Sequence, residues 1–269
     1  MNEDRSRSGV DFRPVTGPQE AEGVRRFLLA QGWAGLAAGY ELTRLARRGV
    51  KPEEVLWLLP GRAEETRAVA FLHQDLAGLV LTSSDQGLAA QALLHDHLPL
   101  VRHIAVMEGQ VDCSGFDEFD CYRREITVAP ELRTPDAPLP AIRPGTSQDV
   151  DQIQAVYQHV TWMRRDTPEG WRQRIAEQPC WVAEVDGEVV AVARWTMSFG
   201  SWVEVGGVAT RPDFRRHGAA TAVTVAAAAA ARAAGRQVAL RYGDPALATL
   251  YHPLGFEHVG RELVFQRRS

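Results

Sequence analysis

The chain has 269 residues, of which 45% are hydrophobic and 24% charged, the balance of a globular protein that buries a core. A net charge of −4 and a pI of about 6.1 exclude a generally basic surface, so we expect no nucleic acid among its main partners. No apolar run approaches the roughly 20 residues that span a bilayer, and the polar N-terminus lacks the apolar core of a signal peptide. We therefore expect a cytoplasmic protein with no membrane partner.

The first half of the chain predicts alternating strands and helices, from apolar runs and from apolar residues at helical spacing. We expect helices at 20–31 and 87–94, and strands at 12–16, 55–59, 68–72, 76–82, 101–107 and 124–128.

Cysteine and histidine placement predicts no metal site. Cys113, Cys121 and Cys180 form no CxxC pair, which is typical of reduced thiols in the cytoplasm. His95 and His97 stand together at a predicted helix end, where side chains are usually solvated.

A proline-rich segment divides the sequence. Alternate prolines across 134–140 deny both a helix and a paired strand, so we predict a linker there. The predicted domains are therefore residues 1–133 and 141–269.

The second half predicts the order β-α-α-β-β-β-α-β-α-β, an α/β domain with a mixed sheet. A favoured hairpin turn, Asp186-Gly187, joins two of its strands. Arg13-Pro14 and Arg143-Pro144 begin the two halves alike, which hints at an internal duplication. We expect helices at 149–160, 171–177, 219–234 and 245–253, and strands at 141–147 (with its turn), 180–185, 189–196, 203–210, 237–241 and 258–266.

A candidate anion-binding loop, Arg215 to Ala220, lies between a predicted strand and a long alanine-rich helix. The first turn of a helix offers backbone N–H groups without partners and the positive end of the helix dipole. Gly218 and the alanines after it leave room for a phosphate or pyrophosphate against those groups. A surface turn that happens to contain basic residues is the alternative.

Two segments together resemble the GNAT acetyltransferase superfamily. Residues 204–220 resemble its central motif, an apolar strand, a proline turn and Arg/Gln-x-x-Gly-x-Gly/Ala, here with Arg215, Gly218 and Ala220. Residues 244–256 resemble its second signature, with matches at Leu250, Tyr251, Gly255 and Phe256 and departures at Asp244 and Leu247. The resemblance covers 141–269 and implies a GNAT fold there. It also implies that the first half is a degenerate GNAT-like domain that packs against or lids the second.

The resemblance implies that acetyl-CoA is the acyl donor and that its pantetheine arm enters a gap beside a splayed strand. Adjacent glycines, Gly206-Gly207, suit the strand bulge that makes such a gap. The implied cofactor contacts are Val208, Ala209 and Thr210 for pantetheine, and Arg215, Arg216, His217, Gly218, Ala219 and Ala220 for pyrophosphate.

Two residues are candidates for proton transfer. Tyr251 stands where the family draws the acid that protonates the CoA sulfur; the alternative is a half-buried anchor for the turn after it. Glu204 stands where several members draw a base; the alternative is a solvated glutamate on a strand. Glu184 and Glu188 are weaker candidates for the base.

The acceptor is expected to be an amine of a small molecule. The segment between the first two helices usually selects the substrate in this family, which implies Trp162, Met163 and Arg165 as candidate contacts. The same residues could equally belong to the core and a solvated helix end. Two other functions stay open: a non-catalytic acyl-CoA-binding module, and an N-acetyltransferase of proteins or peptides.

The first half carries only a poor match to the loop, at 84–89, where an acidic residue replaces the positive charge that phosphate needs. We therefore expect one cofactor site, in the second half. A homodimer is left open.

Overall fold

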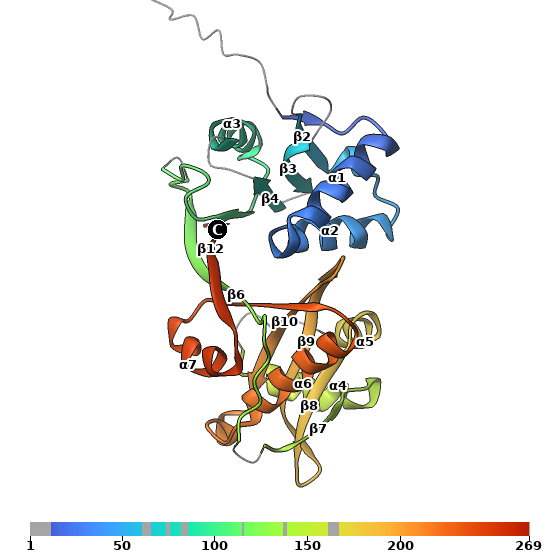
Figure 1. The fold of residues 1–269 in the computed structure, drawn as a ribbon, viewed down its shortest axis with the longest axis vertical. Coiled ribbons are helices and arrows are strands. Elements are labelled where there is room, and N and C mark those ends of the chain that lie inside the picture. Colours follow the sequence, from blue (N-terminus) through green and yellow to red (C-terminus); the bar gives the residue numbers. More distant parts are fainter. Residues whose placement is uncertain are drawn as a thin grey trace, which may run out of the picture. The chain divides into compact units, whose positions relative to one another are not determined.

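A computed structural model describes residues 12–60, 66–73, 76–81, 86–114, 116–136, 139–160 and 167–268. Two compact units divide the chain, Met1–Arg124 with Gly260–Ser269, and Glu125–Val259. Figure 1 shows their helices and strands. No helix among these residues is both long and apolar enough to cross a membrane.

The described strands of the first unit follow the order β1-β2-β3-β4-β5-β12. Neighbouring strands are antiparallel except β4 and β5, which are parallel. Its elements are β1 (Arg13–Pro14), α1 (Pro18–Ala30), α2 (Leu36–Ala46), β2 (Leu56–Pro60), β3 (Thr66–His73), β4 (Leu76–Leu81), α3 (Gly87–His97), β5 (His103–Met107) and the end of β12 (Glu257–Arg267).

The second unit has strands in the order β6-β11-β10-β9-β8-β7, with β10 and β11 parallel. Its elements are β6 (Phe119–Val128, from Glu125 onward), β7 (Ala141–Pro144), α4 (Val150–Tyr157), α5 (Pro168–Glu177), β8 (Cys180–Val185), β9 (Glu188–Phe199), β10 (Trp202–Thr210), α6 (Ala219–Ala233), β11 (Gln237–Tyr242) and α7 (Ala248–Tyr251).

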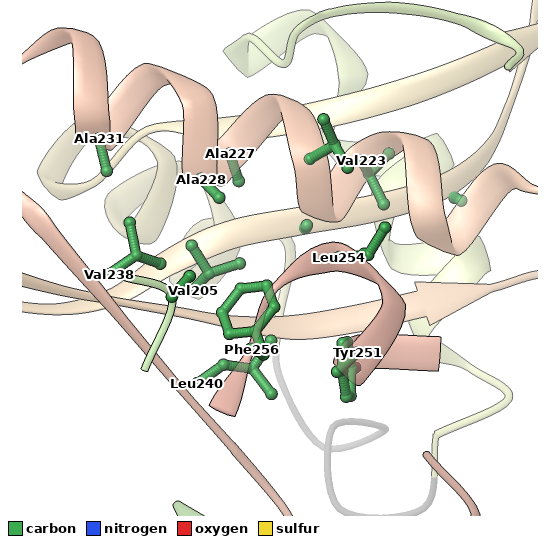
Figure 2. Close-up of a cluster of buried hydrophobic side chains, with 14 of the residues drawn as sticks. Val205, Val223, Ala227, Ala228, Ala231, Val238, Leu240, Tyr251, Leu254 and Phe256 are labelled. Carbon is green, nitrogen blue, oxygen red and sulfur yellow. The ribbon is translucent and has the colours of Figure 1, made fainter. Parts of the chain in front are cut away.

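Helices cover both faces of the second unit's sheet because its strands are apolar on both sides. Val192 of β9 packs with α4 and α5, whereas its neighbours Ala191 and Ala193 pack with α6. Successive side chains of a strand point to opposite faces, so this alternation separates the two cores. Figure 2 shows the α6 side, where Val223, Ala227 and Ala228 point toward Tyr251, Leu254 and Phe256.

Each unit completes its sheet with a strand from the other half of the sequence. Glu125–Val128 of β6 pairs with Ala239–Tyr242 of β11, and Glu262–Gln266 of β12 pairs with His103–Met107 of β5. The chain therefore exchanges one strand in each direction.

These bounds differ from the predicted domains 1–133 and 141–269. The break falls within β6, and the last strand completes the first unit instead of the second. The end of the predicted first domain packs onto the second unit, since Leu132 lies against its core and the Arg133 N–H donates to the Leu254 carbonyl at 2.9 Å. A proline run shows where local pairing ends, but not which remote strands pair.

The two units begin with the same ionic contact, called here the latch: an arginine and a threonine that both donate to one carboxylate. In the first unit, Arg13 and the backbone N–H and hydroxyl of Thr16 all donate to the Glu20 carboxylate. The Arg13 hydrogen bond is the main cause that lowers the pKa of Glu20 to about 2.

In the second unit, Arg143 donates to both oxygens of Asp149 at 2.8 and 2.9 Å, and Thr146 donates to Asp149 from its N–H and hydroxyl. The Arg143 hydrogen bond lowers the pKa of Asp149 to about 2. The Arg-Pro-x-Thr repeat in the sequence is thus also a repeat of contacts. The element order β-α-α-β-β-β-α-β is shared as well.

Most predicted elements are present, and several differ in extent, such as β6 and α5, which begin at Phe119 and Pro168 where 124 and 171 were predicted. Leu36–Ala46 forms α2, which the sequence analysis did not predict because Gly35 and Gly39 interrupt the helical pattern. The helix predicted at 149–160 begins at Val150, since Asp149 belongs to the cap before it. The helix predicted at 245–253 is three short turns centred on α7. Positive φ angles of 52° and 81° at Asp186-Gly187 confirm the predicted hairpin turn.

Replacing Gly255 by alanine is expected to lower the free energy of unfolding by about 3 kcal/mol or more. Gly255 has φ of +89°, and an added Cβ would overlap the carbonyl oxygen of Glu131. Gly187→Ala is the matched control: its φ is +81°, but an added Cβ has nothing within 4 Å. We expect that variant to lose only about 1 kcal/mol in denaturant unfolding. Equal losses would mean that the Glu131 contact does not constrain the turn.

Candidate active site

The second unit's sheet splits between β10 and β11. The two strands pair over Trp202–Glu204 and Gln237–Ala239, and the described pairing then ends. β10 nevertheless continues to Thr210 and β11 to Tyr242. The strands therefore diverge, and β10 turns an edge of backbone N–H and C=O groups toward the gap.

The divergence follows from irregularities in the pairing of β9 with β10. The register shifts between Glu204 and Val205 and again between Gly206 and Ala209. Gly207 has φ of +59°, and the Tyr157 hydroxyl donates to its carbonyl. An added Cβ at Gly207 would stand 2.9 Å from that hydroxyl oxygen. The glycine pair thus lies at a bulge, where side chains crowd the backbone too closely for any larger residue.

The end of β10 carries the residues predicted to meet pantetheine. Val208, Ala209 and Thr210 lie beyond the last paired position of β10 with β11. The Thr210 hydroxyl is buried without a hydrogen-bond partner among the described residues. A buried hydroxyl with no partner is costly, so this position favours a ligand that can bond to it.

A tight loop leads from β10 to α6. The Arg215 guanidinium donates to the Thr210 carbonyl at 3.4 Å, and Arg216 has a positive φ of 63°. Gly218 caps α6 in the left-handed conformation, with φ of +79° and no side-chain hydrogen bond to the cap. Within the described part of the chain, no side chain caps the first N–H groups of α6, the arrangement that favours an anion.

The basic side chains of the loop differ in how they are placed. Arg211, just before the loop, pairs with Glu188 at 2.5 Å and lies over the Phe214 ring. Arg215, Arg216 and His217 are exposed, whereas Ala219 is buried and Ala220 half-buried. The structure thus brings all six predicted loop residues to one helix end, with the charged side chains of Arg215 and Arg216 exposed beside it.

Tyr251 lies at the end of α7 and is buried in the core beside β10, β11 and α6. Its ring centroid lies 5.4 Å from that of Tyr242 and 6.0 Å from that of Phe256. Burial raises the pKa of the Tyr251 phenol to about 12, with a smaller contribution from Tyr242. Asp244, a departure from the signature, caps the turn before α7 by accepting from the Ala246 N–H at 2.9 Å. The position therefore keeps its structural role.

Glu204 stands at the point where β10 and β11 part, and it is buried, not solvated. Its Oε1 accepts from the Thr196 hydroxyl and its Oε2 from Arg241 of β11, both at 2.5 Å. This contact spans 37 residues in sequence, so the sequence analysis could not find it. The weaker candidates are occupied too: Glu184 pairs with Arg143, and Glu188 with Arg211.

The predicted acceptor contacts Trp162, Met163 and Arg165 lie outside the described residues. Sequence reasoning missed three neighbouring residues on the α4 and α5 side. Trp171 stacks on Tyr157 with centroids 4.5 Å apart, and Arg194 of β9 lies over the Trp171 ring. An arginine in the middle of an apolar strand is the signal that could have drawn attention to Arg194.

In the first unit, Gln110 lies close to the corresponding elements, the end of β4 and the start of α3. β4 and β5 are also parallel, over Leu76–Gly78 with His103–Ala105. Beyond them, the Gln110 side-chain amide donates to the Leu81 carbonyl at 3.2 Å. The Gln110 carbonyl would overlap a Cβ added at Gly87, the first residue of α3. In the predicted weak match at 84–89, residues 84 and 85 lie outside the described residues, and the rest leads into the start of α3. Among all the described residues of the chain, no group of three or more His, Cys, Asp or Glu side chains could hold a metal ion.

Comparison with known proteins points to one family. Residues 147–256 match the family model described as "Acetyltransferase (GNAT) family". A search of curated proteins finds no match.

Solved structures resemble the chain in fold, and their sequence identities are too low to indicate a shared function. A GNAT-family acetyltransferase from Colwellia psychrerythraea covers 96% of this chain and 100% of its own, with 10% identity and a TM-score of 0.62. A GCN5-related N-acetyltransferase from Sphaerobacter thermophilus covers 95% and 94%, with 15% identity and a TM-score of 0.62. One from Kribbella flavida covers 76% and 87%, with 18% identity and a TM-score of 0.53.

Proposed function

Residues 147–256 form a domain of the acetyltransferase (GNAT) family, and from this premise we propose that the protein transfers the acetyl group of acetyl-CoA to an amine of a small molecule. The observation that carries the proposal is the combination, on one stretch of chain, of the unpaired end of β10 and the uncapped end of α6. A fold alone does not fix a function, so the proposal rests on this site.

Acetyl-CoA fits the residues along that stretch. The edge of β10 at Val208–Thr210, with its unpartnered Thr210 hydroxyl, would bond the amides of pantetheine. The α6 N-terminus at Gly218 and the cations Arg215 and Arg216 would hold the pyrophosphate. The thioester would then lie near the bulge at Gly207.

In the proposed reaction, the neutral amine attacks the thioester carbonyl; a C–N bond forms and the C–S bond breaks. The amine loses one proton and the departing thiolate gains one. Tyr251 is the proposed donor to the sulfur, because a phenol with a pKa of about 12 keeps its proton at neutral pH. Glu204 is the proposed acceptor of the amine proton, directly or through water. Each carboxylate oxygen has lone-pair capacity beyond its one hydrogen bond to Thr196 or Arg241.

We propose that the first unit is a degenerate copy that binds no acyl-CoA. The repeated latch and element order support a common origin for the two units. The Gln110 contacts support loss of the cofactor position, since they occupy the end of β4 and the start of α3.

Titration calorimetry with acetyl-CoA tests the cofactor site. We expect one molecule bound per chain. Replacing both Arg215 and Arg216 by alanine should raise Kd about 10- to 100-fold, because two charge-assisted contacts to pyrophosphate are lost. The matched control replaces Arg25 and Arg26, an adjacent exposed pair on α1, and should leave Kd unchanged.

Three further outcomes decide between the proposed function and its alternatives. Free-thiol release with a panel of small amines tests turnover, and binding without release for any amine would favour the non-catalytic module. Two molecules bound per chain would contradict the assignment of the first unit, and no binding would contradict the proposed function.

A further inference from the structure

Arg194 of β9 lies level with the bulge where the thioester is proposed to sit. Across the β9–β10 pairing it stands opposite Gly206. An added Cβ at Gly207 would come within 3.2 Å of its Nε. The side chain is half-buried, so part of it remains in contact with solvent.

The guanidinium has no anion to balance it within the described part of the chain. Its Nε is buried without a hydrogen-bond acceptor. No carboxylate of those residues forms an ion pair with Arg194, and the nearby Glu204 is engaged by Arg241 and Thr196. A buried guanidinium nitrogen without a partner is unfavourable, because the group loses water and gains no bond in return.

Aromatic rings hold Arg194 in place. Its Cζ lies 5.8 Å from the centre of the Trp171 ring, which is stacked on Tyr157 at an interplanar angle of 7°. The Tyr157 hydroxyl in turn donates to the Gly207 carbonyl. The guanidinium, the two rings and the bulge therefore form one connected group, and the guanidinium is oriented before any ligand arrives.

Trp171 has a second arginine beside it, so packing against this ring does not by itself require Arg194. Arg174 of α5 also lies over Trp171, with its Cζ 5.6 Å from the ring centre. Both arginines thus lie over Trp171, but only Arg194 also lies beside the bulge at Gly207. What distinguishes Arg194 from Arg174 is its position beside Gly207.

We propose that Arg194 binds a carboxylate of the reacting molecules, so that the substrate class is an amine or an acyl group that carries a carboxylate. A planar guanidinium matches the two oxygens of a carboxylate in a bidentate pair. This inference rests on the proposed function, because it takes the bulge as the place of reaction. The carboxylate belongs either to the acceptor amine or to the acyl chain, and the two sources are separable by experiment.

The experiment compares Arg194→Gln with Arg174→Gln as the matched control. Acceptors are offered in pairs, an amino acid and its α-amide, each with acetyl-CoA. Donors are offered in a second pair, acetyl-CoA and succinyl-CoA, with a neutral amine. For a carboxylate on the acceptor, we expect Arg194→Gln to raise KM for the amino acid about 10- to 100-fold and to leave the amide unchanged. For a carboxylate on the acyl group, the rise falls on succinyl-CoA instead.

Arg174→Gln should change neither the KM ratio of amino acid to amide nor that of succinyl-CoA to acetyl-CoA. Arg194→Lys should recover only part of the preference, since lysine restores the charge without the planar, two-pronged guanidinium. Equal loss for the charged and neutral members of both pairs would overturn the inference, because Arg194 would then only support the bulge. A wild-type preference for neutral substrates in both pairs would overturn it too. In either case, turnover with acetyl-CoA would still support the proposed function. Absence of acetyl-CoA binding would instead contradict the proposed function itself, and with it the inference about Arg194.

Discussion

Replacing Tyr251 by phenylalanine is expected to lower kcat about 10²- to 10⁴-fold, with little change in the Kd for acetyl-CoA. The variant removes the proposed proton donor and keeps the ring that packs against Tyr242 and Phe256. Steady-state kinetics on thiol release, with calorimetry for acetyl-CoA, separates the two effects. The melting temperature should stay close to that of the wild type, because the hydroxyl contributes little to the packing of the core.

The control for Tyr251 is Tyr242→Phe. That ring lies beside Tyr251, and its hydroxyl lies 3.3 Å from His252 Nε2. We expect kcat within a few-fold of the wild type. An acid must be protonated to act, so activity that depends on Tyr251 is lost only as pH rises toward its pKa of about 12. No decline from this group is expected between roughly pH 7 and 10. Unchanged kcat in Tyr251→Phe would leave the tyrosine as a structural anchor alone.

A fragment of residues 134–269 is expected not to fold, although it contains the whole matched region 147–256. It lacks β6, so β11 loses its antiparallel partner along Ala239–Tyr242. It also loses Ile126 and Ala129, which are buried. Burial of a large apolar side chain contributes about 1.5–3 kcal/mol, a substantial share of a total stability of about 5–15 kcal/mol. An unpaired edge strand adds a tendency to aggregate.

Circular dichroism and size-exclusion chromatography check this expectation. The matched fragment, residues 119–269, keeps β6 and should regain a cooperative thermal transition and acetyl-CoA binding. If the 134–269 fragment is monomeric and unfolds cooperatively at the full-length temperature, then the strand exchange makes no essential contribution to the second unit.

Local features could be predicted from the sequence because their causes lie within a few residues. The hairpin turn at Asp186-Gly187 needs two positive φ angles, which this dipeptide tolerates. The glycine pair at Gly206-Gly207 indicated a bulge because close approach leaves no room for a side chain. The loop from Arg215 to the start of α6 was found for the same reason, as a compact run of small and basic residues.

Remote contacts could not be predicted. Glu204 reads as a glutamate on a strand until Arg241 of another strand lies beside it. Nothing in the sequence near Arg194 shows that Trp171 and Gly207 would flank its guanidinium. The exchange of β6 and β12 could not be predicted for the same reason. The residue pattern of each strand fits either sheet, and only the folded chain shows which sheet it joins.

That exchange has a consequence for how the protein is made. A chain leaves the ribosome N-terminus first, and ordinary domains fold in that order as they emerge. Here the first unit lacks its last strand until Gln266 has been synthesised, even though β5 ends at Met107. The second unit needs β6, which emerges before it, and is complete by Val259. We therefore expect the half that is translated first to be finished last, with the edge of β5 in need of protection during synthesis.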